Sequence, residues 1–258
     1  MTEKQKFGGI ARLYGESQLA ALNNAHFCVI GIGGVGSWSA EAIARSGVGK
    51  ITIIDLDDIC TTNINRQIHA TTATVGKAKV DEMALRIAAI SPQCEINVIE
   101  DFVTKDTVNE YLSNAYDVVI DATDSIQAKA AIIGYCKRNK ITVITVGGAG
   151  GQIDPRQITS GDLAKTIQDP LAAKLRSELR RFYNFSKNPK RRFGVECVYS
   201  TEQLRYPQPD GSVAHHKSVL DGSTRLDCSS GFGASTMVTA TFGMIAAARA
   251  VERYLDKI

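Results

Sequence analysis

The feature that most constrains the fold is a regular alternation of short apolar segments with amphipathic segments between residues 26 and 151. In the amphipathic segments apolar residues recur at helical spacing, as Val80, Met83 and Ile87 do. We therefore predict strands at 26–32, 50–55, 94–101, 116–124 and 141–151, and helices at 36–47, 76–91, 106–114 and 125–140. Strands that alternate with helices form a mostly parallel sheet with helices on both faces. The predicted fold class is α/β, with a Rossmann-like, doubly wound sheet.

The segments on either side of this alternation are predicted to belong to the same fold. Residues 1–26 are expected to form an N-terminal helical arm, 27–151 the main domain, and 152–258 a basic insertion followed by a C-terminal apolar helix. Within the insertion we predict a helix at 161–183, a strand at 193–203 and a loop at 206–225. The chain starts with polar and charged residues and no export signal, so we expect a cytoplasmic protein with reduced cysteines.

The stretch 231–251 carries no charge before Arg249 and is about long enough to cross a membrane. Its composition is small residues and Thr rather than Leu and Ile. This composition favours a buried helix or a helix at a subunit interface, and membrane association is the less favoured alternative.

A glycine-rich turn follows the first predicted strand. Its pattern is Gly-x-Gly-Gly-x-Gly, formed by Gly31, Gly33, Gly34 and Gly36. Glycines here allow a tight turn and let backbone N–H groups approach a phosphate at the start of the next helix. Asp55, at the end of the second predicted strand, is placed to accept hydrogen bonds from ribose hydroxyls. These features fit a nicotinamide dinucleotide and ATP equally well.

The polar residues that follow the second strand favour ATP. Asn63, Arg66, Gln67 and Lys79 come in quick succession, and a dehydrogenase has no need of this cluster. A triphosphate does, because Arg66 and Lys79 can neutralise its charge and stabilise the leaving phosphate or pyrophosphate. Asn63 and Gln67 can hold phosphate oxygens in position.

Asp124 follows the fourth predicted strand, in the segment Asp-Ala-Thr-Asp-Ser. Ligands bind at the carboxyl edge of such a sheet, and a carboxylate among phosphates indicates Mg²⁺. We therefore predict that residues 27–151 bind ATP with Mg²⁺ and that Asp124 binds the Mg²⁺ held by the nucleotide. Arg66, Lys79 and Asp124 are the predicted catalytic residues of this domain.

With these motifs the chain resembles the ubiquitin-activating-enzyme-like adenylating family, which includes the activators of molybdopterin- and thiamine-pathway sulfur carriers. The resemblance rests on Gly-x-Gly-Gly-x-Gly at 31–36, Asp-x-Asp at 55–57, Asn-x-Asn-Arg-Gln at 63–67, Lys79 and Thr-Asp at 123–124. It implies ATP·Mg²⁺ on the glycine turn, Asp55 on the ribose, and the Asn, Arg, Gln and Lys side chains on the phosphates. It also implies activation of a substrate carboxylate and a homodimer.

Two features differ from the sulfur-carrier activators of that family. Those proteins usually carry two Cys-x-x-Cys zinc pairs, whereas the six cysteines here form none, so no zinc is expected. Family members often have an N-terminal arginine that reaches the γ-phosphate bound by the partner subunit. Gly9 stands at that position in this chain, and Arg12 is the candidate substitute.

Further segments look like the branch of this family that dehydrates threonylcarbamoyladenosine in tRNA. They lie at 12–16, 147–155, 162–176 and 227–243. The resemblance implies that ATP activates the side-chain carboxylate of the modified adenosine next to the anticodon. The ureido nitrogen of the same group then attacks it and closes a hydantoin ring, through either an acyl-adenylate or an acyl-phosphate. The branch is associated with a cysteine desulfurase and its sulfur-acceptor partner, which are therefore possible partners here.

A basic segment independently indicates an RNA partner. Residues 165–192 hold nine cationic and two acidic side chains, a net charge of +7 in a chain of +3 overall. Such a local patch suits contacts with a phosphate backbone, and a solvated helix face is the alternative. The cationic residues are Lys165, Lys174, Arg176, Arg180, Arg181, Lys187, Lys190, Arg191 and Arg192. Among them lie Phe182, Tyr183 and Phe185, which either stack on bases or belong to the core.

Cys228 comes just before a predicted helix, where a thiolate is stabilised. It is a candidate sulfur acceptor or thioester-forming nucleophile in the catalytic set, and a packed thiol at a dimer contact is the alternative.

Three other functions stay open on the sequence. One is activation of the C-terminal carboxylate of a small sulfur-carrier protein, against which the missing zinc pairs and the basic segment argue. Another is a non-catalytic, nucleotide-gated adaptor for tRNA or a desulfurase, against which Arg66, Lys79 and Asp124 argue. The last is a nicotinamide dehydrogenase, which the polar run at 63–67 disfavours.

Overall fold

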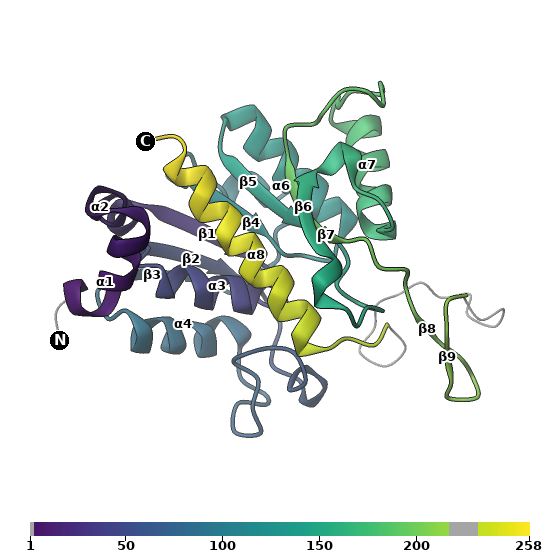
Figure 1. Ribbon diagram of the computed structural model, residues 1–258, viewed down its shortest axis with the longest axis horizontal. Helices are drawn as coiled ribbons and strands as arrows, with labels where there is room; N and C mark the ends of the chain where they lie inside the picture. Colours follow the sequence, from purple (N-terminus) through teal and green to yellow (C-terminus); the bar gives the residue numbers. More distant parts are fainter. Residues whose placement is uncertain (1–2, 217–231) are drawn as a thin grey trace.

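A computed structural model describes residues 3–216 and 232–258 of the chain. Its centre is a seven-stranded sheet in which every neighbouring pair is parallel except β7 and β6 (Figure 1). In sheet order the strands are β3 (Glu95–Ile99), β2 (Lys50–Ile54), β1 (His26–Ile30), β4 (Val118–Asp121), β5 (Thr142–Val146), β7 (Glu196–Ser200) and β6 (Ile158–Asp162). The predicted α/β, doubly wound sheet is confirmed.

Helices cover both faces of the sheet. They are α1 (Glu3–Tyr14), α2 (Glu16–Asn24), α3 (Gly36–Arg45), α4 (Lys79–Ile90), α5 (Val108–Tyr111), α6 (Ile126–Asn139), α7 (Pro170–Phe182) and α8 (Thr236–Leu255). Alternate residues of each strand point to opposite faces, so Phe27 and Val29 of β1 join a core with α3, α4 and α8. Cys28 and Ile30 join a second core with α5, α6 and α7. The central strands β1, β2, β4 and β5 are almost entirely buried, as parallel strands between two helical layers are. The edge strands β3 and β6 are partly exposed.

Short elements complete the chain. They are the 3₁₀ turns η1 (Thr61–Asn63), η2 (Pro155–Gln157) and η3 (Leu163–Lys165), and a small hairpin of β8 (Tyr206–Pro207) and β9 (Val213–Ala214). The loop predicted at 206–225 is thus a hairpin in its first part, and its last part lies outside the described residues.

The prediction of one helix over 161–183 is wrong. Gly161 and Asp162 end β6, and a helix begins only at Pro170. Asp162 accepts a hydrogen bond from the N–H of Ala164, which closes the turn η3. Proline disfavours helical geometry in the residue before it and is well placed at the first helical position. The chain therefore restarts a helix at Asp169–Pro170, with the carboxylate of Asp169 as the cap.

The apolar stretch at 231–251 contributes most of α8, which crosses the face formed by α3 and the sheet (Figure 1). Gly243 lets the two helices approach closely, because a Cβ there would lie 2.5 Å from the carbonyl oxygen of Val35. The hydroxyl of Ser39 donates to the carbonyl of Gly243 across the same contact. Of the helices within the described residues, none has both the length and the hydropathy to cross a membrane.

Candidate functional site

A cleft of about 1110 Å³ opens at the carboxyl ends of β1, β2, β4 and β5. This is the edge at which α/β sheets bind ligands. Nine residues predicted from the sequence line it: Gly31, Gly33, Gly34, Asp55, Asn63, Arg66, Gln67, Lys79 and Asp124. They come from five separate stretches of chain, and the parallel sheet brings them to one edge.

The glycine turn between β1 and α3 is packed too tightly for side chains at two of its positions. Gly31 has φ +85°, and a Cβ there would meet the backbone of Ala122 at 2.9 Å. A Cβ on Gly36, the first residue of α3, would lie 1.8 Å from the carbonyl oxygen of Gly31. At Gly33 the nearest atom to such a Cβ is 3.9 Å away, so this face of the turn is open to the cleft. In the first turn of α3 the N–H groups of Ser37 and Ser39 donate to the carbonyls of Gly33 and Val35, each at 3.1 Å. The partial positive charge at a helix start favours an anion in the cleft beside it.

Asp55 is held rigidly at the end of β2. Its carboxylate accepts hydrogen bonds from the N–H of Ile32 at 2.6 Å and the N–H of Asp57 at 2.9 Å. Burial raises the pKa of the Asp55 carboxyl, and the nearby Lys79 ammonium opposes that change. The side chain thereby ties the glycine turn to the β2 edge and offers a carboxylate in the cleft.

Lys79 is a buried cation at the first turn of α4, an end of a helix that disfavours positive charge. Two carboxylates hold it: its Nζ lies 2.6 Å from Asp57 Oδ2 and 3.8 Å from Asp55 Oδ1. Asp57 is the more exposed of the two, with 55% of its side chain accessible. A phosphate in the cleft would compete with Asp57 for this ammonium. The sequence contained Asp57 in its Asp-x-Asp motif but gave it no role.

The loop between β2 and α4 carries the remaining polar residues. The Asn63 carboxamide accepts the N–H of Cys60 at 3.0 Å, which fixes the turn η1. The backbone carbonyl of Arg66 accepts from the Trp38 indole at 3.0 Å, and its half-buried guanidinium donates to the carbonyl of Thr62 at 2.7 Å. The buried Oε1 of Gln67 has no hydrogen-bond partner among the described residues. An unpaired buried acceptor is costly, so this cleft is suited to a ligand that brings a donor.

A fully buried ion pair supports the loop that bears Asp124. Lys129 Nζ lies 3.1 Å from Asp121 Oδ2, and both side chains are completely inaccessible to solvent. The Thr145 hydroxyl donates to the same carboxylate oxygen at 2.7 Å. The other oxygen of Asp121 accepts from the N–H and hydroxyl of Thr123. This network joins β4, β5 and α6 beneath the cleft and leaves Asp124 exposed at its edge.

Asp169 is a cleft residue that the sequence analysis missed. Its carboxylate accepts from the N–H of Gly148 at 3.0 Å and of Ala172 at 2.8 Å, and burial raises its pKa. It thus joins the glycine-rich end of β5 to the start of α7, which also lines the cleft through Pro170 and Leu171. The signal was present in the Asp-Pro pair, a common helix start, but the helix was predicted to run through it.

Comparison with known proteins decides the family. The profile of the ThiF family matches residues 9–256. The chain belongs to the ThiF family.

Several relatives in this family are similar over nearly the whole chain. The tRNA threonylcarbamoyladenosine dehydratase of Escherichia coli is 58% identical over 98% of this chain and 95% of its own length. The protein of that name from Haemophilus influenzae is 54% identical with the same coverage. A crystal structure of the Escherichia coli dehydratase in complex with ATP superposes with a TM-score of 0.86, at 54% identity over 98% of this chain and 95% of that one. The resemblance inferred from the motifs is confirmed.

Two predicted residues, Arg12 and Gly36, are not among the residues that line the cleft of this ThiF-family chain. Arg12 is exposed on α1, which packs on α2 away from the cleft residues, so its role in a partner subunit stays a prediction. Cys228 lies outside the described residues. Within the described residues, no group of three or more His, Cys, Asp or Glu side chains is arranged to hold a metal.

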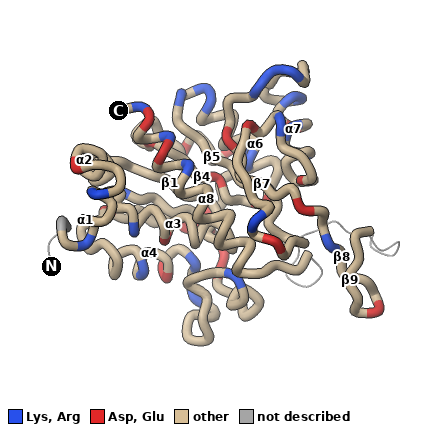
Figure 2. Tube along the Cα trace, viewed as in Figure 1, with Lys and Arg blue, Asp and Glu red and all other residues tan. Residues whose placement is uncertain are grey.

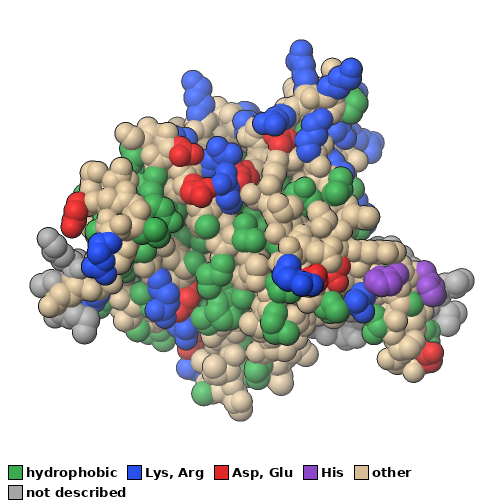
Figure 3. All heavy atoms as spheres, in the orientation of Figure 1, with side chains coloured by type: hydrophobic (Ala, Val, Ile, Leu, Met, Phe, Trp, Pro, Cys, Tyr) green, Lys and Arg blue, Asp and Glu red, His purple; other side chains and the backbone are tan. Residues whose placement is uncertain are grey.

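The basic segment of this ThiF-family chain forms a patch on α7 and the loop that follows it (Figures 2 and 3). Lys174, Arg181, Lys187 and the cations at 190–192 are exposed. Arg176 and Arg180 are half-buried, and Lys165 donates to the carbonyl of Pro189 at 2.6 Å. None of the nine forms a salt bridge with a carboxylate of residues 3–216 or 232–258. The patch therefore keeps its positive charge.

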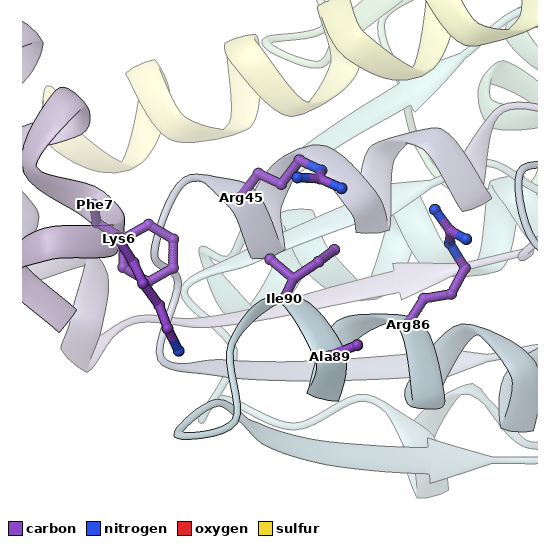
Figure 4. Close-up of a pocket in the computed structure, with 6 residues that line it drawn as sticks. All are labelled: Lys6, Phe7, Arg45, Arg86, Ala89 and Ile90. Atoms are coloured by element: carbon purple, nitrogen blue, oxygen red, sulfur yellow. The ribbon is translucent and has the colours of Figure 1, made fainter. Parts of the chain in front are cut away.

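A second hollow, of about 520 Å³, lies between α1, α3 and α4 and contains none of the predicted site residues (Figure 4). Its lining residues are Lys6, Phe7, Arg45, Arg86, Ala89 and Ile90. Arg45 and Arg86 both donate to the buried carboxylate of Glu41, at 2.7 and 3.1 Å. Their charge is thus partly balanced within the fold, and we assign no function to this hollow.

Proposed function

We propose that this protein uses ATP to dehydrate the threonylcarbamoyl group on the adenosine next to the anticodon of tRNA, which closes it to a hydantoin. The observation that carries the proposal is the cleft at the carboxyl edge of the sheet, where Asp55, Arg66, Lys79 and Asp124 meet the glycine turn. Similarity to named dehydratases over almost the full chain supports the same reaction.

The residues of the cleft fit ATP by their chemistry. The open side of the glycine turn and the start of α3 suit a phosphate group. Asp55 is assigned to the ribose hydroxyls, and Arg66 and Lys79 to the phosphate charge. Asn63 and Gln67 are assigned to phosphate oxygens. The buried oxygen of Gln67, which has no partner within residues 3–216 and 232–258, suits a hydroxyl or water donor beside them.

Mg²⁺ fits the same site. It usually keeps several waters and binds proteins through one or two carboxylates together with substrate phosphates. Asp124 is an exposed carboxylate on the rim of the cleft, and Asp57 is a second, half-exposed one beside Lys79. These two side chains would hold the metal, which would neutralise phosphate charge. No zinc site is proposed, because the sequence has no Cys-x-x-Cys pair.

The reaction balances without an outside nucleophile. An oxygen of the side-chain carboxylate attacks a phosphorus atom of ATP, and pyrophosphate or ADP leaves. The ureido nitrogen then forms a bond to the activated carbonyl carbon, loses its proton, and expels AMP or phosphate that carries the former carboxylate oxygen. The sum is the loss of one water from the nucleoside. The protein's part is to hold the groups in position and to stabilise developing negative charge with Arg66 and Lys79.

The tRNA is assigned to the basic patch. The start of α7 lines the cleft and the rest of the helix leads into the exposed cations. Phosphate contacts by such cations position an RNA without reading its sequence. A tRNA substrate also supports our proposal of a cytoplasmic location.

A homodimer is part of the proposal, with Arg12 of each chain directed to the nucleotide of the other. A cysteine desulfurase and its sulfur-acceptor partner are the further partners we propose, with Cys228 as the sulfur acceptor. Both ideas follow from the family resemblance and from the sequence.

The test is mass spectrometry of nucleosides from tRNA that carries threonylcarbamoyladenosine, after incubation with the protein and ATP·Mg²⁺. We expect the modified nucleoside to lose one water, and we expect Lys79→Ala to abolish the loss. Lys257→Ala, which removes an equivalent charge at the far end of α8, should leave the reaction intact. ATP binding without any change in the nucleoside would contradict the proposal. ATP–pyrophosphate exchange that requires a small protein with a C-terminal Gly-Gly would favour the sulfur-carrier alternative, and no turnover with either substrate would favour the adaptor.

A further inference from the structure

Three aromatic residues, Phe182, Tyr183 and Phe185, lie at the end of α7 and just after it. The structure places them in different surroundings. Tyr183 packs against α6, where a Cβ on Gly134 would lie 2.4 Å from its ring. Phe185 lies edge-to-face with Phe193, with 4.9 Å between ring centroids. Phe182, in contrast, is 59% exposed. Two of the three thus belong to the core, and one is left on the surface.

Phe182 is already partnered on one side by a cation. The guanidinium carbon of Arg181 lies 4.9 Å from the centroid of the Phe182 ring. An arginine over an aromatic face is a favourable cation–π contact, and it restricts the ring while much of its surface stays accessible. Arg181 is itself exposed and forms no salt bridge with a carboxylate of the described residues.

The surroundings of Phe182 favour a nucleic acid over an apolar protein partner. The loop that follows α7 carries Lys187 and the three cations at 190–192, all exposed. Single-stranded RNA is bound by this combination, in which cations follow the backbone and an aromatic ring receives a base.

Helix α7 sets the distance from Phe182 to the cleft. Its first residues, Pro170 and Leu171, line the cleft, and Phe182 is its last residue. Twelve residue steps of an α-helix span about 18 Å. Stacked nucleotides advance about 3.4 Å per step, and unstacked ones up to roughly twice that. An RNA loop with one base in the cleft therefore reaches Phe182 with a base about three to five nucleotides away.

We infer that Phe182, with Arg181 behind it, is a stacking platform for an unpaired base of the same RNA loop that carries the reacting adenosine. The inference rests on the proposed function, because it takes the occupant of the cleft to be an adenosine of tRNA. It adds a contact to a base about three to five nucleotides from the reacting one. The phosphate-contacting cations would hold the backbone between the two.

The test is a set of binding measurements with an anticodon stem-loop that carries threonylcarbamoyladenosine. Each unpaired nucleotide of the loop is replaced in turn by an abasic one. Dissociation constants are measured for the wild type, Phe182→Ala, Phe182→Tyr and the control Leu85→Ala, which removes a 64% exposed side chain from α4. Dehydration of the intact stem-loop and ATP affinity are measured in parallel.

We expect Phe182→Ala to weaken binding of the intact stem-loop about five-fold or more, since loss of one base–aromatic stack typically costs at least this much. Phe182→Tyr and Leu85→Ala should bind as the wild type does, with ATP affinity unchanged in all. At one loop position, three to five nucleotides from the reacting base, the abasic substitution should remove the effect of Phe182→Ala. If Phe182→Ala weakens binding equally for every abasic stem-loop, or does not weaken it for any stem-loop, the inference is overturned.

The two proposals fail in different ways. If the wild type leaves the intact stem-loop unmodified, the proposed reaction is refuted, while binding that depends on Phe182 and on one base still supports the platform. If the wild type dehydrates the stem-loop and Phe182→Ala binds every stem-loop as tightly as the wild type does, the reaction stands and the platform is refuted.

Discussion

His69 offers a sharp test of how the loop between β2 and α4 is held. Its side chain is almost fully buried, and neither ring nitrogen has a hydrogen-bond partner among the described residues. Burial lowers the pKa of His69 from 6.5 to about 4, and the positive charges of Lys79 and Arg86 act in the same direction. The ring is therefore neutral in the folded protein at pH 7.

The consequence for stability has a definite sign. Below pH 6.5 the unfolded chain takes up a proton at His69 that the folded chain refuses until about pH 4. Stability from this group is thus fully present above about pH 6.5 and is lost as the pH falls toward 4. Between pH 7 and pH 4.5 the loss amounts to about 2.5 kcal/mol of unfolding free energy.

His69→Leu should remove this dependence. We expect it to leave the unfolding free energy at pH 7 unchanged or slightly higher, because it replaces a buried polar ring that has no hydrogen-bond partner in the described part of the chain. The assay is urea unfolding at pH 7, 5.5 and 4.5, followed by the fluorescence of the single tryptophan, Trp38. The variant should gain about 2.5 kcal/mol on the wild type by pH 4.5. If the two curves stay parallel across this range, His69 is not a buried neutral base and the reasoning fails.

Three further outcomes follow from the cleft and its support. Gly36→Ala should lower the free energy of unfolding by about 1–3 kcal/mol or more and weaken ATP binding in calorimetry, because its Cβ would meet the carbonyl oxygen of Gly31. The matched control is Gly9→Ala, whose Cβ would have no described atom within 4 Å. This control should leave stability unchanged or raise it. Lys129→Met should lower the free energy of unfolding in urea by about 3–5 kcal/mol, since it leaves the Asp121 carboxylate buried without its cation. Adding Asp121→Asn should recover part of this free energy. No recovery in the double variant would contradict the ion-pair account. Asp55→Asn should weaken ATP binding at least ten-fold, as loss of hydrogen bonds to a charged group does; an unchanged dissociation constant would remove Asp55 from the ribose.

The parts of the fold that depend on local periodicity could be predicted from the amino-acid sequence. The buried face of a strand repeats every second residue, and the buried face of a helix repeats every third or fourth. This spacing of apolar residues predicted β1 to β5 and the helices between them. The glycine turn and the residues at 55, 63–67, 79 and 124 were also found, because parallel strands place their carboxyl ends at one edge. Any chain with these elements must bring those residues together.

Features that depend on contacts between distant segments became visible only in the folded structure. Nothing local in residues 158–162 signals that β6 pairs antiparallel with β7, because the partner strand lies more than thirty residues away. The same holds for Asp169, whose place in the cleft follows from its bond to Gly148. Phe182, Tyr183 and Phe185 are alike in sequence, and only the packing of α7 on α6 shows which ring is free. Burial is a property of neighbours in space, and a sequence pattern gives neighbours only along the chain.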